Sequence, residues 1–232
     1  MKLKYKIFII VFIGTIFTIF ISSKTMDQKV TVVAIGDGLS LGMTSYDMVG
    51  VSYNDYLTDD LEKKDVLQNF NNEYSIEHQT IEELYMALDK NEKGHKTSVA
   101  IKQTLAKAEV ITLGIGMDEF VDYSIKNKLN DEQIEKFLQY FNAVLKNIRS
   151  FYDKELIVIS LYPIYGLDKN TIFSINQRIL EITHQNKAKF LDITALSLNP
   201  EYYADGTSYY MNYKGHLAIY KQLIKLLPLN LI

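Results

Sequence analysis

A chain of 232 residues, 47% of them hydrophobic, is long enough for one domain with a full core and short for two. The formal net charge is −3 and charged residues of both signs are mixed along the chain, which argues against nucleic-acid binding. Cysteine is absent, so disulfides, thiol catalysis, thiolate metal sites and lipidated cysteines are excluded.

The beginning of the chain has the pattern of a membrane anchor. Three lysines precede an uncharged, apolar run over residues 7–23. Such an arrangement directs insertion with the amino end in the cytoplasm. The run falls slightly short of the ~20 residues of a relaxed transmembrane helix, and no A-x-A-like cleavage site follows it. We expect residues 1–24 to form a single-pass signal anchor; a cleaved signal peptide and a buried core helix are the alternatives.

The anchor would place the rest of the chain on the extracytoplasmic side of the cell membrane. A short polar linker over residues 25–29 follows it, and one domain is expected over residues 30–232. The first strand signal of this domain, Val-Thr-Val-Val-Ala-Ile over residues 30–35, breaks abruptly into Gly36, Asp37 and Gly38. In an open α/β sheet, ligands bind beyond the carboxyl ends of such strands.

Helical and strand patterns alternate along the remainder of the chain. Helices are expected over residues 53–64, 80–88, 97–108, 131–152, 172–185 and 215–227, and further strands over residues 66–70, 110–113, 156–161 and 189–193. Thr80 and Glu83 can form a capping box, and asparagines after Phe70 predict a turn there. Because the strands are continuously apolar, the pattern predicts an α/β fold with a doubly wound parallel sheet of five strands, covered on both faces.

The run Gly36-Asp37-Gly38-Leu39-Ser40-Leu41-Gly42 resembles block I of the SGNH/GDSL hydrolases, G-D-S-L-S-x-G, in which the nucleophilic serine follows the aspartate. Here Gly38 stands at the serine position and has no side chain that could attack a substrate. Three further stretches match the family in chain order, over roughly residues 30 to 228. The resemblance implies a three-layer, flavodoxin-like SGNH fold with strand order 2-1-3-4-5, and no cofactor.

Blocks II and III of the family supply the oxyanion donors. His78 occupies the block II glycine position, two residues before Thr80; the resemblance assigns its backbone N–H to the oxyanion, and we expect its ring to crowd the pocket. Block III, G-x-N-D, corresponds to Gly116-Met117-Asp118-Glu119, so Asp118 replaces the asparagine whose amide donates to the oxyanion. A carboxylate offers acceptors where a donor is required, and its charge opposes an oxyanion.

Block V, D-x-x-H-P followed by a glycine that opens the last helix, provides the base in the family. Counting back from Gly215 places Thr207 at the aspartate position and Tyr210 at the histidine position. No general base remains there. The resemblance therefore supports the fold and, at the same positions, argues against hydrolysis.

A relocated set of groups is the alternative. Ser40 matches the second serine of block I, Asp205 lies five residues before Tyr210, and His216 lies six residues after it. A working dyad needs Ser40 and His216 within hydrogen-bond reach of each other. Otherwise Ser40 would cap its turn and His216 would lie on the surface of the last helix.

Three carboxylates are expected at the ends of the first and third strands. Asp37, Asp118 and Glu119 could bind Ca²⁺, Mg²⁺ or a cationic ligand group, together with Gly38 and Tyr210 as the rest of a ligand site. The plainer interpretation is that Asp37 accepts from backbone N–H groups of its own turn and that Glu119 reaches solvent. We assign no metal site.

Two function classes remain open at this point. The first is a catalytically silent SGNH-like domain, a pseudoenzyme that acts as a binding or scaffolding module of the cell envelope, with an envelope glycan or polymer as the partner that location and family suggest. The second is an envelope esterase or acyl-transfer enzyme with relocated catalytic groups. Replacement at every chemical position favours the first class.

Overall fold

A five-stranded parallel sheet lies at the centre of the computed structural model, which describes residues 29–94, 98–126, 129–228 and 231. The strand order is β2-β1-β3-β4-β5, as predicted. The strands are β1 (Val30–Gly36), β2 (Leu67–Ser75), β3 (Val110–Gly114), β4 (Glu155–Ile159) and β5 (Lys189–Leu191). Gly36 pairs with Ser75 of β2 and with Gly114 of β3, so these three strands end at the same level.

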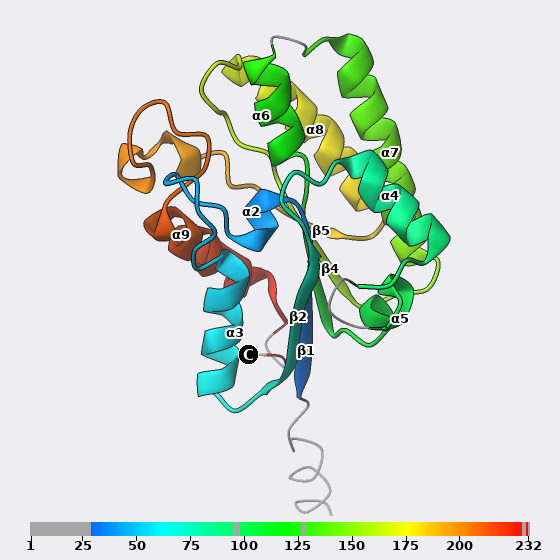
Figure 1. Cartoon of the computed structure of the whole chain (residues 1–232). Coiled ribbons are helices and arrows are strands. Elements are labelled where there is room, and N and C mark those ends of the chain that lie inside the picture. The colour runs from blue at the N-terminus through cyan, green and yellow to red at the C-terminus, as the bar shows by residue number, and fades with distance from the viewer. Residues whose placement is uncertain (1–28, 95–97, 127–128, 229–230, 232) are drawn as a thin grey trace, which may run out of the picture.

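Helices cover both faces of the sheet (Figure 1). They are α2 (Gly38–Leu41), α3 (Tyr53–Lys63), α4 (Ile81–Lys90), α5 (Ile101–Ala106), α6 (Met117–Ile125), α7 (Asp131–Arg149), α8 (Lys169–Gln185) and α9 (Tyr213–Leu223). Three short 3₁₀ helices follow β5 and α9: η1 (Leu196–Leu198), η2 (Pro200–Tyr202) and η3 (Ile224–Leu226). Helices α3 and α9 pack together on one face, and α4, α7 and α8 pack on the other. The three-layer α/β arrangement is thereby confirmed.

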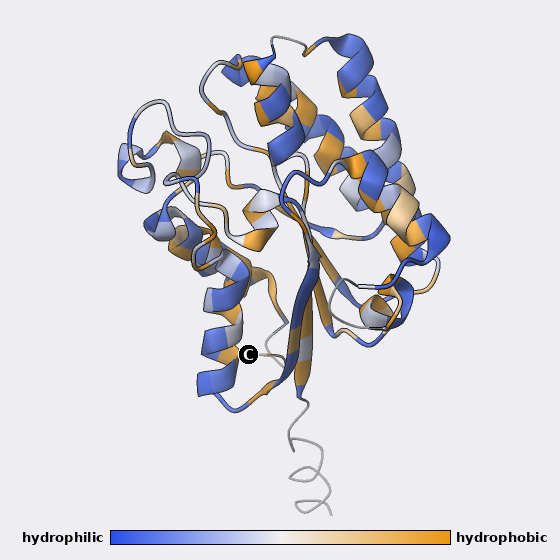
Figure 2. Ribbon diagram, viewed as in Figure 1, coloured by the Kyte–Doolittle hydropathy of each residue, from blue (hydrophilic) through white to orange (hydrophobic). Residues whose placement is uncertain are grey.

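The core follows from the apolar strands and from the apolar stripes of the helices. Every residue of β1 and of β3 is buried, which explains why these strands read as continuous hydrophobic runs. Helix α7 turns an apolar stripe inward, and Phe137 meets the Phe120 ring edge-on with 5.2 Å between centroids. Figure 2 shows the hydrophobic residues gathered along the strands and on the inner sides of the helices.

Several elements differ from the prediction, among them the short helix α2, which was not predicted. The strand predicted over residues 66–70 continues to Ser75, because Asn71 produces a bulge instead of a turn: its Oδ1 accepts from the Glu73 N–H at 3.0 Å, and the register with β1 shifts there. β2 is an edge strand, so polar side chains are tolerated along it. Helix α6 was not predicted at all; it follows Gly116 directly.

The membrane-anchor prediction falls on residues 1–28, which lie outside the described residues. In the part of the chain that the structure does describe, no helix combines the length and apolarity that crossing a membrane requires.

Candidate functional site

The carboxyl end of β1 carries the predicted turn and packs it against β3. Gly36 has a φ of +139°, and a Cβ built on it would lie 1.8 Å from the Gly114 carbonyl oxygen, so no side chain fits there. The Asp37 N–H donates to the same oxygen at 2.9 Å. Close contact between β1 and β3 thus fixes the direction in which the chain enters α2.

Asp37 is fully buried and connects this turn to α6. Its Oδ1 accepts from the Leu39 N–H at 3.0 Å, which caps α2, and its Oδ2 accepts from the Asp118 N–H at 3.1 Å. Burial, and then the nearby charge of Asp118, raise the pKa of Asp37 well above the usual range of an aspartate. The Asp37 side chain therefore accepts hydrogen bonds from the backbone of two segments, its own turn and the start of α6.

Asp118 lies at the centre of the site, only 4% exposed, and three donors surround its carboxylate. Oδ2 accepts from the backbone N–H of Gly38 at 3.0 Å and of His78 at 2.6 Å. Oδ1 accepts from the Tyr210 hydroxyl at 2.5 Å. Burial, followed by the Asp118 charge and hydrogen bond, raises the pKa of Tyr210, which keeps its hydroxyl protonated as a donor. The structure thus brings Gly38, His78, Asp118 and Tyr210 together.

Gly38 and Asp118 fit each other sterically. A Cβ added to Gly38 would lie 2.8 Å from Oδ1 of Asp118, closer than real Cβ contacts, and 3.0 Å from Oδ2, so the carboxylate would have to shift to admit it. The Asp118 carboxylate therefore fills the space that a side chain at position 38 would need. A serine at this position and an aspartate in this rotamer exclude each other.

His78 departs from its expected place. Its φ is +61°, in the left-handed region, which explains why the family pattern has glycine here. Its side chain is 80% exposed, so the expectation that the ring crowds the pocket is wrong. The positive φ turns the backbone N–H toward Asp118 and the ring toward solvent. The backbone N–H of His78 is present, as the resemblance requires, but it donates to the Asp118 carboxylate.

The other block V positions do not reach the site. Thr207 is exposed, and its N–H and hydroxyl both donate to Asp205 Oδ1 at 2.8 Å. The Ser208 hydroxyl donates to the same oxygen at 3.1 Å. Asp205 therefore stabilises its own exposed loop. Neither Asp205 nor Thr207 is hydrogen-bonded to Asp118 or Tyr210.

Ser40 and His216 are both buried and belong to separate contacts. The Ser40 hydroxyl donates to the Ile35 carbonyl at 3.2 Å and lies 3.2 Å from the Tyr53 hydroxyl. The His216 ring stacks on Tyr53 with 6.2 Å between centroids, and its Nε2 lies 3.0 Å from the Met43 carbonyl oxygen. No hydrogen bond joins Ser40 to His216 within the described residues. The expectation that His216 lies on the helix surface is wrong, since it is 0% exposed; burial lowers its pKa and favours the neutral ring.

Sequence reasoning missed the polar residues that hold Ser40. Asn54 donates from Nδ2 to the Ser40 carbonyl at 3.1 Å, and its Oδ1 accepts from the Thr112 hydroxyl at 2.7 Å. Asn54 and Thr112 are 0% exposed. Their signal was available: Asn54 lies beside Tyr53 at the start of a helix, and Thr112 interrupts an otherwise apolar strand. Together with Tyr53 they form a buried network beneath the β1 turn.

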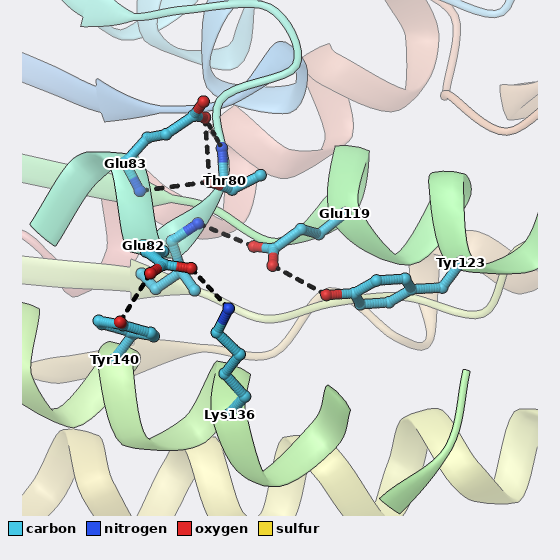
Figure 3. A network of polar contacts seen from close by, with 8 residues as sticks. Thr80, Glu82, Glu83, Glu119, Tyr123, Lys136 and Tyr140 are labelled. Atoms are coloured by element: carbon cyan, nitrogen blue, oxygen red, sulfur yellow. Dashed lines mark hydrogen bonds and ion pairs between the residues drawn. The ribbon is translucent and has the colours of Figure 1, made fainter. Parts of the chain in front are cut away.

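Glu119 points away from the Asp37 and Asp118 carboxylates. Its Oε2 accepts from the Ile81 N–H at 2.8 Å, at the start of α4, and its Oε1 accepts from the Tyr123 hydroxyl at 3.2 Å (Figure 3). Glu119 is partly exposed and lines a hollow, so the expectation that it reaches solvent holds only in part; burial raises its pKa. Among the described residues, no group of three or more histidines and carboxylates is arranged to hold a metal ion.

Hollows open near this edge of the sheet, including one of about 440 Å³ beside His78 and Gln79. Two others lie close to Asp118 or to the loop that leads to Tyr210. One, of about 270 Å³, lies beside the site and is lined by Asp118, Glu119, His78 and their neighbours on α6. The other, of about 540 Å³, lies between the loop after β4 and the loop that leads to Tyr210. Neither is lined by Gly38, whose N–H faces the Asp118 carboxylate.

No protein-family model matches the sequence, and no curated protein is similar to it. Solved structures are similar in fold. An acetylxylan esterase from Geobacillus stearothermophilus has a TM-score of 0.64 at 14% identity, over 87% of this chain and 95% of that one. A lipase/acylhydrolase from Enterococcus faecalis has a TM-score of 0.60 at 16% identity, over 84% and 93%. A member of the lipolytic protein G-D-S-L family from Veillonella parvula has a TM-score of 0.59 at 12% identity, over 84% and 97%.

The fold is that of the SGNH/GDSL hydrolases. The expected resemblance is thereby confirmed at the level of architecture, over 93–97% of the length of these neighbours. At such low identity the likeness shows the fold alone. The function of this chain therefore depends on the residues of its own site.

Proposed function

We propose that the domain is a catalytically silent SGNH-fold module, a binding or scaffolding component of the cell envelope that is tethered by residues 1–24. The observation that carries the proposal is the occupancy of the backbone N–H of His78 and of Gly38 by the Asp118 carboxylate. The resemblance assigns the first of these N–H groups to the oxyanion.

An ester substrate would meet three obstacles here. Gly38 offers no nucleophile. Its neighbour Asp118 presents a fixed negative charge where negative charge would develop on the substrate, and loss of one oxyanion donor alone costs about 10²–10³ in rate. The base position is held by Tyr210, whose hydroxyl donates to Asp118 and whose pKa is raised. As a protonated donor, Tyr210 cannot accept the proton of an attacking hydroxyl.

The alternative, an esterase that uses Ser40 and His216, lacks support in the contacts. Ser40 is 1% exposed and its hydroxyl is engaged with Ile35 and Tyr53. A nucleophile needs both a base in reach and access to substrate. The favoured function is therefore binding. Since solved structures of similar fold include esterases of acetylated xylan, a glycan is the class of ligand that we propose.

The test is an esterase assay on the full chain purified in detergent. We expect p-nitrophenyl acetate to be hydrolysed no faster than by a heat-denatured control. Gly38→Ser alone should stay inactive, because its Cβ collides with Asp118. The combined variant Gly38→Ser, Asp118→Asn and Tyr210→His restores together the side chains of the three positions that meet in this structure, as groups that act as a unit require.

The matched control is Ser40→Ala in the unaltered chain. Saturable turnover by the unaltered chain that Ser40→Ala abolishes would overturn the silent-domain proposal and support the relocated mechanism. Turnover that appears in the combined variant and is absent from the unaltered chain would support the proposal directly.

A further inference from the structure

The hollow of about 540 Å³ lies between the loop after β4 and the loop that leads to Tyr210, and hydrogen bonds hold both loops in place. On one side the Tyr165 carbonyl accepts from the Ser124 hydroxyl of α6 at 3.1 Å. On the other side Asn212 donates from Nδ2 to the Glu201 carbonyl at 2.9 Å and to the Tyr203 carbonyl at 3.2 Å. The hollow is therefore shaped before any ligand arrives, as small-molecule sites usually are.

Large apolar surfaces line this hollow and are left in solvent. Tyr165 and Leu198 face it from opposite loops, and each is 57% exposed. A tyrosine ring that lies open in a hollow offers a flat apolar face with a polar edge. Such a face suits a ligand that has both C–H surface and polar groups.

The polar residues that line the hollow carry charges of both signs, and one of them, Tyr203, has a hydroxyl without a hydrogen-bond partner among the described residues. Lys169 makes no ion pair within the described residues, and exposed Asp205 supplies one negative charge, so the two charges offset each other. The buried Tyr203 hydroxyl makes no hydrogen bond of normal length there; the nearby Ser197 hydroxyl donates instead to the Thr194 carbonyl at 2.7 Å. A buried polar group without a partner is costly, and a rotation of the Tyr203 side chain that brings its covered hydroxyl to the hollow would let a ligand hydroxyl satisfy it.

We propose that this hollow binds a neutral saccharide, with one sugar ring stacked on Tyr165 and a sugar hydroxyl bonded to Tyr203. A saccharide combines C–H faces with hydroxyls that both donate and accept, which matches an aromatic wall beside Lys169, Asp205 and Tyr203. The offset charges disfavour a strongly anionic ligand, and the polar lining disfavours a lipid chain. This inference rests on the proposed binding function and names where and what the module binds.

The experiment is calorimetric titration of the full chain in detergent with four probes: chitotetraose, xylotetraose, maltotetraose and the acidic tetragalacturonate. We expect at least one neutral probe to bind, and Tyr165→Ala to weaken its binding about tenfold, the effect of ~1.4 kcal/mol. Tyr203→Phe, which removes only the hydroxyl, should weaken binding severalfold. Tyr46→Ala is the matched control, because Tyr46 is 55% exposed and lies on another loop; it should bind as the unaltered chain does.

Three outcomes overturn the inference: no binding of any neutral probe at millimolar concentration, equal binding by Tyr165→Ala and Tyr46→Ala, or a preference for tetragalacturonate. Because Tyr165 is exposed, its substitution should leave the circular dichroism spectrum unchanged, which separates lost binding from lost folding. The esterase assay reports independently. Esterase activity together with saccharide binding would refute the silent-domain proposal and leave this inference standing.

Discussion

Asp118 places a carboxylate where the resemblance assigns an asparagine that donates to an oxyanion. An anion at this position is held by two backbone N–H groups and one hydroxyl, the kind of donor set that would stabilise an oxyanion. In this chain the Asp118 carboxylate itself is the anion that these donors bind. Glycine at position 38 leaves room for this carboxylate, since a Cβ there would collide with it in its present position. The two departures from the family pattern are therefore one structural change.

The contacts of Asp118 predict its effect on stability. Asp118→Ala would leave the N–H groups of Gly38 and His78 and the Tyr210 hydroxyl without their acceptor, and a buried carboxylate-bound network of this kind costs about 3–5 kcal/mol to break. Asp118→Asn keeps one oxygen for the two N–H groups, and its amide can donate to the Tyr210 hydroxyl. We expect thermal unfolding, followed by circular dichroism, to show a much smaller loss for Asp118→Asn. Equal losses for both variants would contradict the assigned hydrogen bonds.

The buried carboxyl of Asp37 predicts a pH dependence. Because its pKa is raised in the folded chain, the folded chain binds this proton more tightly than the unfolded chain does. The stability that this contributes is fully present below the unfolded pKa of about 3.9 and is lost as the pH rises through the folded pKa. Asp37→Asn cannot titrate. We expect the free energy of unfolding of the unaltered chain, minus that of Asp37→Asn, to decrease with rising pH and then level off.

The matched control for this measurement is Asp205→Asn. Asp205 is exposed, and its pKa is lowered by the Thr207 and Ser208 hydrogen bonds. Its contribution is therefore present above the unfolded pKa and lost toward acid, so the same subtraction should slope the opposite way. A pH-independent difference for Asp37→Asn would show that burial does not perturb this carboxyl.

At the scale of elements, the start of α4 explains why Glu119 is unavailable to a ligand. Thr80 and Glu83 form the predicted capping box, and Glu119 accepts the Ile81 N–H that follows it. Figure 3 shows the next residue, Glu82, bound to Tyr140 and Lys136 of α7. Acidic side chains are favourable at a helix N-terminus. The acidic residues here connect α4 to α6 and α7.

The elements also show what local patterns could and could not predict. The capping box of α4 and the apolar face of α7 depend on residues only three or four positions apart. The sequence alone therefore indicates both. The asparagines of β2 were recognised as local hydrogen-bonding residues, yet whether they end a strand or make a bulge is decided by pairing with β1, a long-range contact. Helix α6 begins at a glycine without a side-chain cap, so the usual start signal is absent.

For the whole molecule, the sheet could be predicted and the site geometry only in part. Alternating patterns and the family resemblance led to the strand order, and Gly38, Asp118 and Tyr210 do meet at the carboxyl edge. Sequence could not show that the His78 ring turns outward. This orientation depends on a positive φ, which leaves no periodic trace. His216, however, lies three and seven residues before the buried Ile219 and Leu223, so helical spacing did signal its burial.

The direction of β1 gives the tether proposal a geometric consequence. β1 begins at Val30 and ends at the Asp37 turn, so the start of the strand and the site lie at opposite edges of the sheet (Figure 1). A chain tethered through residues just before Val30 would hold the site and the 540 Å³ hollow on the side away from the tether. This orientation suits a module that reaches into the envelope.

The corresponding prediction concerns intact cells. Three lysines followed by an uncharged run without a cleavage site predict an uncleaved anchor with its amino end in the cytoplasm. Protease added outside intact cells, after opening of the cell wall, should remove the domain, and extraction of the full chain should require detergent. A variant with two lysines inserted into residues 7–23 is the control, because central charges make insertion costly; it should be protected in the cytoplasm. Recovery of a soluble chain that begins near Ser23 would show instead that the segment is a cleaved signal peptide.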